Sequence, residues 1–301
     1  MMVWRSVRAR CGVAVSVLAI AGGGLLPAAV SPATAAPAPP TVTIVREGPH
    51  TATLAMADAT VTCPSGSRLV GGGGQVLTED PHLQQLQPRY AANGTSSWYL
   101  YALQVPDAAR QLDVRTSAVC VTSGPATQLV TAKGNASVGT GRVNVVVPCP
   151  EGTHVLGGGA TLPKGSNGND TGYLASSFPA SDLRSWNAAA VAAGGVSVTG
   201  YAICAQPGPA TQVVASTLTS GVNNNTWLEA TAVCPEGTHI TGGGADGRGG
   251  YLTHISARHD HSFDSQINAD RDFDQWTVYM RVNIPSIASL VAYTVCESDT
   301  W

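Results

Sequence analysis

The stretch CPEGTHVLGGG, residues 149–159, occurs three times in this chain with small variations. The other copies are CPSGSRLVGGG, which begins at Cys63, and CPEGTHITGGG, which begins at Cys234. The first cysteines of the three copies are spaced by 86 and 85 residues. Because a fixed period of this kind marks a duplicated structural unit, the chain is expected to contain three copies of one module.

Further landmarks recur at matching places in each copy. The string GPATQ appears at residues 124–128 and again at 208–212, between the units. A tryptophan follows each glycine-rich stretch, at Trp98, Trp186 and Trp276. A second cysteine ends each unit, at Cys120, Cys204 and Cys296. These landmarks predict repeats over residues 42–124, 125–208 and 209–301.

The sequence of each unit is typical of β structure. Short runs rich in Val, Thr, Tyr and Ile are separated by Gly, Pro, Asn and Ser, and no apolar stripe with helical spacing is present. The C-P-x-G string predicts a turn after a strand, because proline cannot donate to a sheet and glycine tolerates positive φ. The glycine triplet predicts a bulge, or a backbone that another strand or side chain approaches closely.

The expected fold is therefore all-β, with three tandem sandwich-like or barrel-like repeats of about 85 residues. The alternative is one closed three-fold domain resembling a β-prism, in which each unit supplies one sheet. In that alternative the units could not fold alone.

The N-terminus has the features of an export signal. Arg5, Arg8 and Arg10 precede an apolar stretch that ends in small residues, which predicts a signal peptide over residues 1–35. A linker rich in Ala and Pro follows at residues 36–41. The mature chain is expected to be secreted, and no later segment is apolar enough to span a membrane.

The cysteines of the mature chain number six, an even count in an exported protein, and this favours a disulfide framework. The favoured scheme closes a bond within each unit: Cys63–Cys120, Cys149–Cys204 and Cys234–Cys296. A rival scheme also respects the repeat and joins neighbouring units: Cys120–Cys149, Cys204–Cys234 and Cys63–Cys296. Zinc binding is disfavoured because the chain contains no C-x-x-C pair.

The C-P-x-G-x-x-x-x-G-G-G string, followed by a tryptophan and a cysteine, resembles a module of uncharacterised secreted actinobacterial β-repeat proteins. The resemblance covers nearly the whole mature chain. It implies an exported, disulfide-bonded β module and carries no catalytic residue to transfer. The first copy departs from the others, since Arg68 stands where they have His154 and His239.

Composition excludes some function classes. Only 12% of residues are charged, and no basic run follows the first ten residues, so nucleic-acid binding is not expected. The chain has no G-x-S-x-G, H-E-x-x-H or P-loop motif, and no complete acid–base set repeats. The favoured function is a secreted, non-catalytic binding or structural protein of the cell envelope or extracellular space. Its partner is expected to be a cell-wall glycan or another extracellular protein.

Residues shared by the copies are the first candidates for a binding site. Tryptophans in the three equivalent positions are either platforms for stacking a sugar or core residues, and packing fits them at least as well. The histidines that share one position, His154 and His239, are expected to be half-exposed strand residues beside a turn. Arginine in the first copy could not perform the same proton chemistry.

The third unit has a longer segment than the others before its tryptophan. Asp270, Asp272 and Asp274 have a spacing with which a loop can wrap Ca²⁺, although the glycine and glutamate of an EF-hand are missing. His259 and His261 could place two imidazoles on one face of a strand, as a transition-metal pair. Two alternatives follow: a metal-stabilised module, or a secreted hydrolase whose site lies within residues 254–274.

Overall fold

The protein is built from 18 strands, with no helix, in the part of the chain that the computed structural model describes. That part comprises residues 41–52, 56–76, 81–91, 95–104, 112–135, 141–163, 172–192, 196–206, 211–222, 226–258, 275–282 and 286–298. Within these ranges no helix has the length and apolar character needed to cross a membrane. The predicted signal peptide lies outside them, as does the predicted linker apart from Thr41.

Each repeat contributes six strands in the same order. The first repeat forms β1 (Val42–Ala52), β2 (Met56–Thr62), β3 (Arg68–Val76), β4 (Pro81–Tyr90), β5 (Ser96–Gln104) and β6 (Leu112–Val121). The second forms β7 (Thr127–Asn135), β8 (Arg142–Pro148), β9 (His154–Thr161), β10 (Gly172–Pro179), β11 (Ser185–Ala192) and β12 (Ser197–Ala205). The third forms β13 (Gln212–Val222), β14 (Trp227–Val233), β15 (Thr238–Arg248), β16 (Gly250–Arg258), β17 (Gln275–Val282) and β18 (Ser286–Ser298). The all-β prediction is therefore confirmed.

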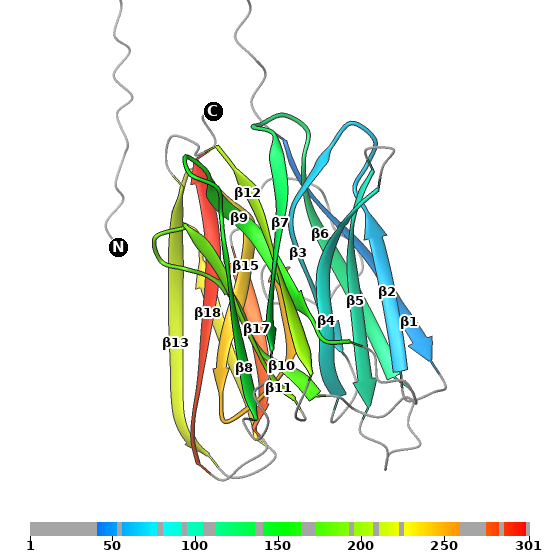
Figure 1. Ribbon diagram of the computed structural model, residues 1–301, viewed down its shortest axis with the longest axis vertical. Coiled ribbons are helices and arrows are strands. Elements are labelled where there is room, and N and C mark those ends of the chain that lie inside the picture. Colours follow the sequence, from blue (N-terminus) through cyan, green and yellow to red (C-terminus); the bar gives the residue numbers. More distant parts are fainter. Residues whose placement is uncertain are drawn as a thin grey trace, which may run out of the picture. The chain divides into compact units, whose positions relative to one another are not determined.

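The strands form three six-stranded sheets, and every sheet combines two repeats (Figure 1). Sheet A has the order β1-β6-β3-β16-β17-β14, so it joins the first repeat to the third. Sheet B has the order β2-β5-β4-β9-β12-β7 and joins the first repeat to the second. Sheet C has the order β13-β18-β15-β10-β11-β8 and joins the third repeat to the second. All neighbouring strands for which a register is defined pair antiparallel.

This topology corrects the expectation of three separate sandwich-like or barrel-like modules. Each repeat divides its strands between two sheets, and each sheet is completed by a neighbouring repeat. The sharing is cyclic, as the closed three-fold alternative requires, but no unit supplies a whole sheet. An isolated repeat would leave two half-sheets with unpaired central edges, which is why the repeats depend on one another.

The C-P-x-G string forms the turn that its residues predict. In the second copy Gly152 has φ of 77°, and the hydroxyl of Thr153 donates to the carbonyl of Pro150 at 2.7 Å. The same bond joins Ser67 to Pro64 and Thr238 to Pro235, each at 2.6 Å. The turn is therefore stabilised locally, and it delivers the chain into β3, β9 or β15, each of which contains a glycine triplet.

The first glycine of each triplet lies against the backbone of another repeat. An ideal Cβ on Gly71 would lie 2.8 Å from Cα of Gly242, and one on Gly157 would lie 2.8 Å from Cα of Gly71. A Cβ on Gly242 would in turn lie 2.9 Å from Cα of Gly157. β3, β9 and β15 approach one another at these glycines. They can do so only because glycine lacks a side chain, which would overlap the backbone of the neighbouring strand. The predicted close approach is confirmed, and so is the bulge, since the registers shift between Leu69 and Gly71 and between Ile240 and Gly242.

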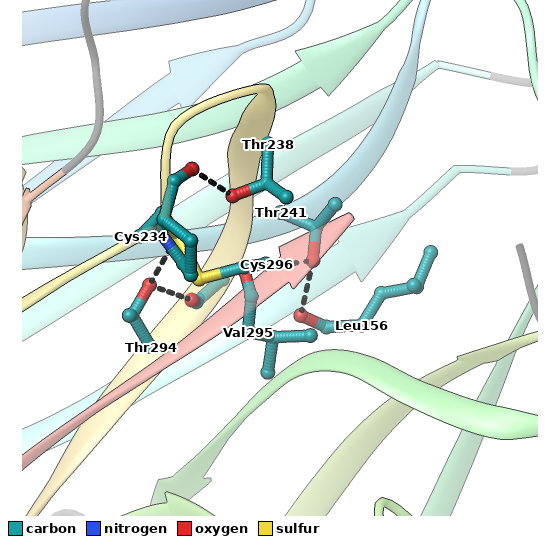
Figure 2. The surroundings of a disulfide bond; sticks show 9 residues. Leu156, Cys234, Thr238, Thr241, Thr294, Val295 and Cys296 are labelled. Carbon is teal, nitrogen blue, oxygen red and sulfur yellow. Dashed lines mark hydrogen bonds between the residues drawn. A yellow bond between two sulfur atoms is a disulfide. The ribbon is translucent and has the colours of Figure 1, made fainter. Parts of the chain in front are cut away.

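The disulfides follow the favoured scheme: Cys63–Cys120, Cys149–Cys204 and Cys234–Cys296. In each bond the first cysteine follows an edge strand of one sheet, and the second lies in a strand of the next sheet. Figure 2 shows the bond of the third repeat, beside which the hydroxyl of Thr241 donates to the carbonyl of Leu156 in the second repeat at 3.2 Å. Each disulfide thus ties together two of the three sheets.

Candidate functional site

The tryptophans do not lie at the surface. Trp98, Trp186 and Trp276 have exposed fractions of 1%, 0% and 0%. Each indole covers the second glycine of its triplet: an ideal Cβ on Gly72 would lie 2.6 Å from Cγ of Trp98. The interpretation of these residues as sugar-stacking platforms is therefore wrong, because their rings are covered by the protein itself. They are core residues, as their shared position favoured.

The histidine position of the motif differs among the copies. His154 is buried, not half-exposed as expected, and its Nε2 lies 3.1 Å from Oε1 of Glu297 in the third repeat. His239 and Arg68 are half-buried, in agreement with the prediction. The guanidinium of Arg68 donates to the carbonyl of Pro125 at 2.9 Å, so it too joins one repeat to the next. In the first and second copies, the position therefore makes a contact between repeats.

The predicted metal-binding residues lie outside the described part of the chain: His259, His261, Asp270, Asp272 and Asp274. The calcium site, the histidine pair and the hydrolase site thus stay predictions. A shift of the melting temperature on adding calcium or a chelator would test the calcium site and the histidine pair. Within the described residues, no group of three or more His, Cys, Asp or Glu side chains is placed to hold a metal ion. His254 belongs to β16 and pairs with Gln75 of β3.

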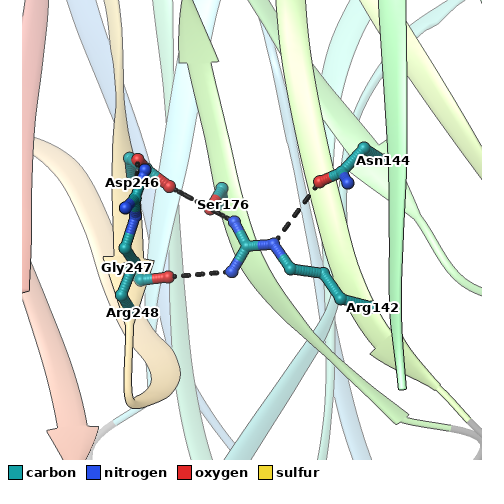
Figure 3. Close-up of polar contacts among 6 residues, drawn as sticks. All are labelled: Arg142, Asn144, Ser176, Asp246, Gly247 and Arg248. Carbon is teal, nitrogen blue, oxygen red and sulfur yellow. Dashed lines mark hydrogen bonds and ion pairs between the residues drawn. The ribbon is translucent and has the colours of Figure 1, made fainter. Parts of the chain in front are cut away.

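A cluster of polar side chains crosses the junction between the second and third repeats in sheet C (Figure 3). The guanidinium of Arg142 donates to Oγ of Ser176 at 2.7 Å and to the carbonyl of Gly247 at 3.2 Å. The hydroxyl of Ser176 donates to Oδ1 of Asp246 at 2.5 Å. Arg142 also forms an ion pair with Asp246 at 3.4 Å. We call these residues, together with Asn144 and Arg248, the sheet C cluster.

The strand register explains how Arg142 reaches so far. Ser176 and Asp246 are direct partners across the junction of β10 and β15. Arg142 belongs to β8, which is separated from β10 by β11. In β11, which lies between β8 and β10, Ala189 is opposite Asn144 of β8 on one side and Ser176 of β10 on the other. Because alanine is small, the arginine side chain can lie across the strand and reach the next repeat.

Two aromatic rings lie on the same sheet beside this cluster. Phe178 of β10 and Tyr293 of β18 are stacked, with ring centroids 4.8 Å apart and an interplanar angle of 18°. They come from strands on either side of β15, and Gly244 lies between them as the direct partner of Tyr293. An ideal Cβ on Gly244 would lie 2.7 Å from Cα of Phe178, so glycine keeps the junction close.

Charges of the cluster act on Tyr293. Burial raises the pKa of its phenol, and the carboxylate of Asp246 raises the pKa further, whereas Arg248 lowers it. The two arginines and one aspartate give the cluster a formal charge of +1, in a chain whose formal net charge is −3. This is a local positive region on an acidic protein.

The equivalent junctions of the other sheets carry different residues. In sheet B the partners are Gln85 and Thr161, and Gln85 donates to the carbonyl of Leu162 at 2.9 Å. In sheet A the partners are His254 and Gln75. The cluster is thus specific to one junction. Sequence reasoning missed the cluster because it consists of residues that the three copies do not share. One signal was present: the residue two positions after the triplet is Asp246 in the third copy but Gln75 or Thr161 in the others.

The cluster holds hydrogen-bond donors and acceptors at fixed positions. The guanidinium of Arg142, the hydroxyl of Ser176 and the carboxylate of Asp246 each have a partner within the cluster, which holds these three side chains in place. Arg142 and Asp246 keep 36% and 16% of their side-chain surface exposed, so both can still meet a ligand. No model of a known protein family matches the chain, and no curated protein matches it.

Proposed function

We propose that this protein is a secreted, non-catalytic binding protein of the cell envelope or extracellular space. In this proposal it binds a glycan on the face of sheet C that carries the sheet C cluster. The observation that carries the proposal is the fixed network of Arg142, Ser176 and Asp246 beside the stacked rings of Phe178 and Tyr293.

The chemistry of sugars matches such a surface. Neighbouring hydroxyls of a sugar donate and accept hydrogen bonds in pairs, and planar carboxylate and guanidinium groups can meet both at once. Aromatic side chains offer large, rigid contact area for the C–H faces of a sugar ring. Because the network is formed before the ligand arrives, little side-chain entropy is lost on binding. The positive formal charge of the cluster favours a glycan that carries acidic groups.

Export is supported by the covalent chemistry. Disulfides form and persist in oxidising compartments, and the described part of this chain contains three of them. They are compatible with an extracellular protein, and the predicted signal peptide would deliver the chain there. A rigid, cross-linked scaffold of sheets is suited to present a fixed polar surface outside the cell.

The test measures binding of the mature chain to isolated cell wall and to an array of neutral and acidic glycans. Arg142→Gln removes a positive charge and the bridge of the cluster, so we expect binding at least tenfold weaker. Lys133→Gln is the matched control, because it removes a positive charge from β7 of sheet B, and it should bind like the wild type. Equal losses in both variants, or binding only to a protein of the cell wall, would contradict the proposal.

A further inference from the structure

Each of the three sheets has two edge strands, and five of these six strands carry a feature that discourages pairing with another chain. Such features include charged side chains, proline and bulges. β1 contains Arg46 and Glu47 and has a register shift after Glu47. The remaining four contain the following residues: Asp58 in β2, Lys133 in β7, Arg142 and Pro148 in β8, and Glu229 in β14.

The sixth edge strand, β13, carries none of these features. Its sequence is QVVASTLTSGV, and its 11 residues include no charge and no proline. It pairs with β18 from Gln212 to Val222 without a register shift, so the strand is regular along its whole length. Among the described residues its other edge has no ladder partner, and the strand lies at the margin of the sheet (Figure 1).

The repeats provide an internal comparison at the centre of this strand. Lys133 of β7 and Thr217 of β13 are equivalent, because each pairs with the residue five before the second cysteine of its repeat, Thr199 or Val291. The equivalent place in β1 falls within the register shift that follows Glu47. The lysine of β7 and the irregularity of β1 are therefore replaced in β13 by an uncharged, β-branched residue within a regular strand. Side chains of β13 around this point are exposed, including Leu218 with an exposed fraction of 37%.

We propose that β13 is an association surface for a second copy of this chain, pairing antiparallel with β13 of that copy about a two-fold axis at Thr217. In this register Thr217 of one chain faces Thr217 of the other chain, and Ala215 faces Thr219 of the other chain. Cross-strand threonine pairs are favourable, and no like charges meet, because the strand carries none. Leu218 would face Ser216 of the other copy, which would cover part of its exposed side chain.

A second copy fits this edge better than the other edges of the same molecule. Pairing of β13 with β7 or β1 of another copy would bring Lys133, Arg46 or Glu47 against an uncharged strand, which offers no opposite charge to them. The two-fold arrangement uses the same surface on both copies, so it closes at a dimer and does not extend into a fibre. The dimer would hold one continuous sheet made from two copies of sheet C.

This association goes beyond the proposed function, and its measurement needs no ligand. One consequence rests on that function: two sheet C clusters would lie on one continuous sheet, so a polymeric glycan could engage both and gain avidity. A protein that dimerises but binds no glycan would support the association alone. A monomer that binds glycan would support the function alone.

The test is the mass of the mature protein in solution, measured by sedimentation over a range of concentrations. The wild type should be a dimer, and Thr217→Lys should have half that mass. Val146→Lys is the matched control, because it places lysine on β8, the opposite edge of the same sheet, where Val146 is 56% exposed. This control should remain a dimer. Wild-type monomers, larger polymers, or a dimeric Thr217→Lys would overturn the proposal.

A second variant tests the register directly. Residues that face each other across an antiparallel pair have Cα atoms about 4.5–5.5 Å apart, within the range of a disulfide. Thr217→Cys should therefore oxidise to a covalent dimer, whereas Thr219→Cys should not cross-link to itself. Circular dichroism and melting of each variant would establish that it is folded before its mass is compared. Efficient cross-linking of Thr219→Cys, or none of Thr217→Cys, would contradict the two-fold register.

Discussion

Nε2 of His154 lies 3.1 Å from Oε1 of Glu297, and this contact joins the second repeat to the third within the interior. The two side chains retain only 7% and 2% of their exposure. The hydroxyl of Thr211 donates to the same carboxylate oxygen at 3.1 Å. Val121 and Ala205 stand at the position of Glu297 in the other repeats, so the carboxylate is present at only one of the three equivalent places.

The first prediction concerns this pair. Glu297→Val introduces the residue of the first repeat but leaves His154 buried without its partner. Removing one partner of a buried pair should lower the free energy of unfolding by about 3 kcal/mol. Urea denaturation of the variant and the wild type measures this change.

A double variant provides the control. His154→Leu combined with Glu297→Val replaces both polar partners by apolar side chains, and this should recover most of the loss. A double variant that is as unstable as the sum of its single changes would show that the two residues do not act as a pair.

The second prediction concerns the first glycine of the triplet. Gly157→Ala would place a Cβ 2.8 Å from Cα of Gly71, and neither backbone can move aside without displacing a central strand. The free energy of unfolding should fall by at least about 2 kcal/mol. Gly141→Ala is the control, because the nearest atom to its Cβ, Cγ1 of Val191, would be 3.9 Å away. That variant should be as stable as the wild type, and equal losses in both would contradict the assigned role.

Local features of this fold were accessible from the sequence because they depend on neighbouring residues. The C-P-x-G turn needs only the proline carbonyl, the glycine and the next hydroxyl, all within four positions. The glycine triplet and the tryptophan recur at fixed spacing, and this pointed to close packing. The disulfide scheme followed from the assumption that a duplicated unit keeps its own bond.

The exchange of strands between repeats was not accessible in the same way. A strand such as β8 alternates buried and exposed residues in the same pattern whichever repeat supplies its neighbour. The sheet C cluster was missed for a related reason, since Arg142 and Asp246 are 104 residues apart and meet only because two repeats share a sheet. The burial of His154 likewise depends on Glu297, 143 residues away.

The third prediction concerns cooperativity. Because every sheet contains strands of two repeats, no repeat can unfold without exposing the sheet edges of its neighbours. Calorimetry of residues 36–301 should show one transition, with the van't Hoff enthalpy equal to the calorimetric enthalpy. Two or three separable transitions would mean that the repeats unfold independently.

The fourth prediction extends this to the disulfides. The bond between Cys149 and Cys204 spans 55 residues, and its removal by serine substitution of both cysteines should cost about 4 kcal/mol. Since the sheets are shared, the loss should lower the melting temperature of the whole unit and not create a second transition. A separate transition that carries only about one third of the calorimetric unfolding enthalpy would mean that one repeat unfolds alone, and it would contradict this expectation.

The last prediction concerns Tyr293, whose phenol has its pKa raised above the ordinary value of 10.0 by burial and by Asp246. The folded protein keeps this proton at a pH where the unfolded chain loses it. The contribution to stability is therefore present below pH 10.0 and is lost as the pH rises through the raised pKa. Asp246→Asn should lower the pKa of Tyr293 toward its ordinary value, whereas Arg248→Gln should raise it, because Arg248 opposes the shift. NMR titration of labelled tyrosine rings measures both changes, with Tyr293→Phe to assign the signal, and shifts of the same sign in the two variants would contradict the assigned electrostatics.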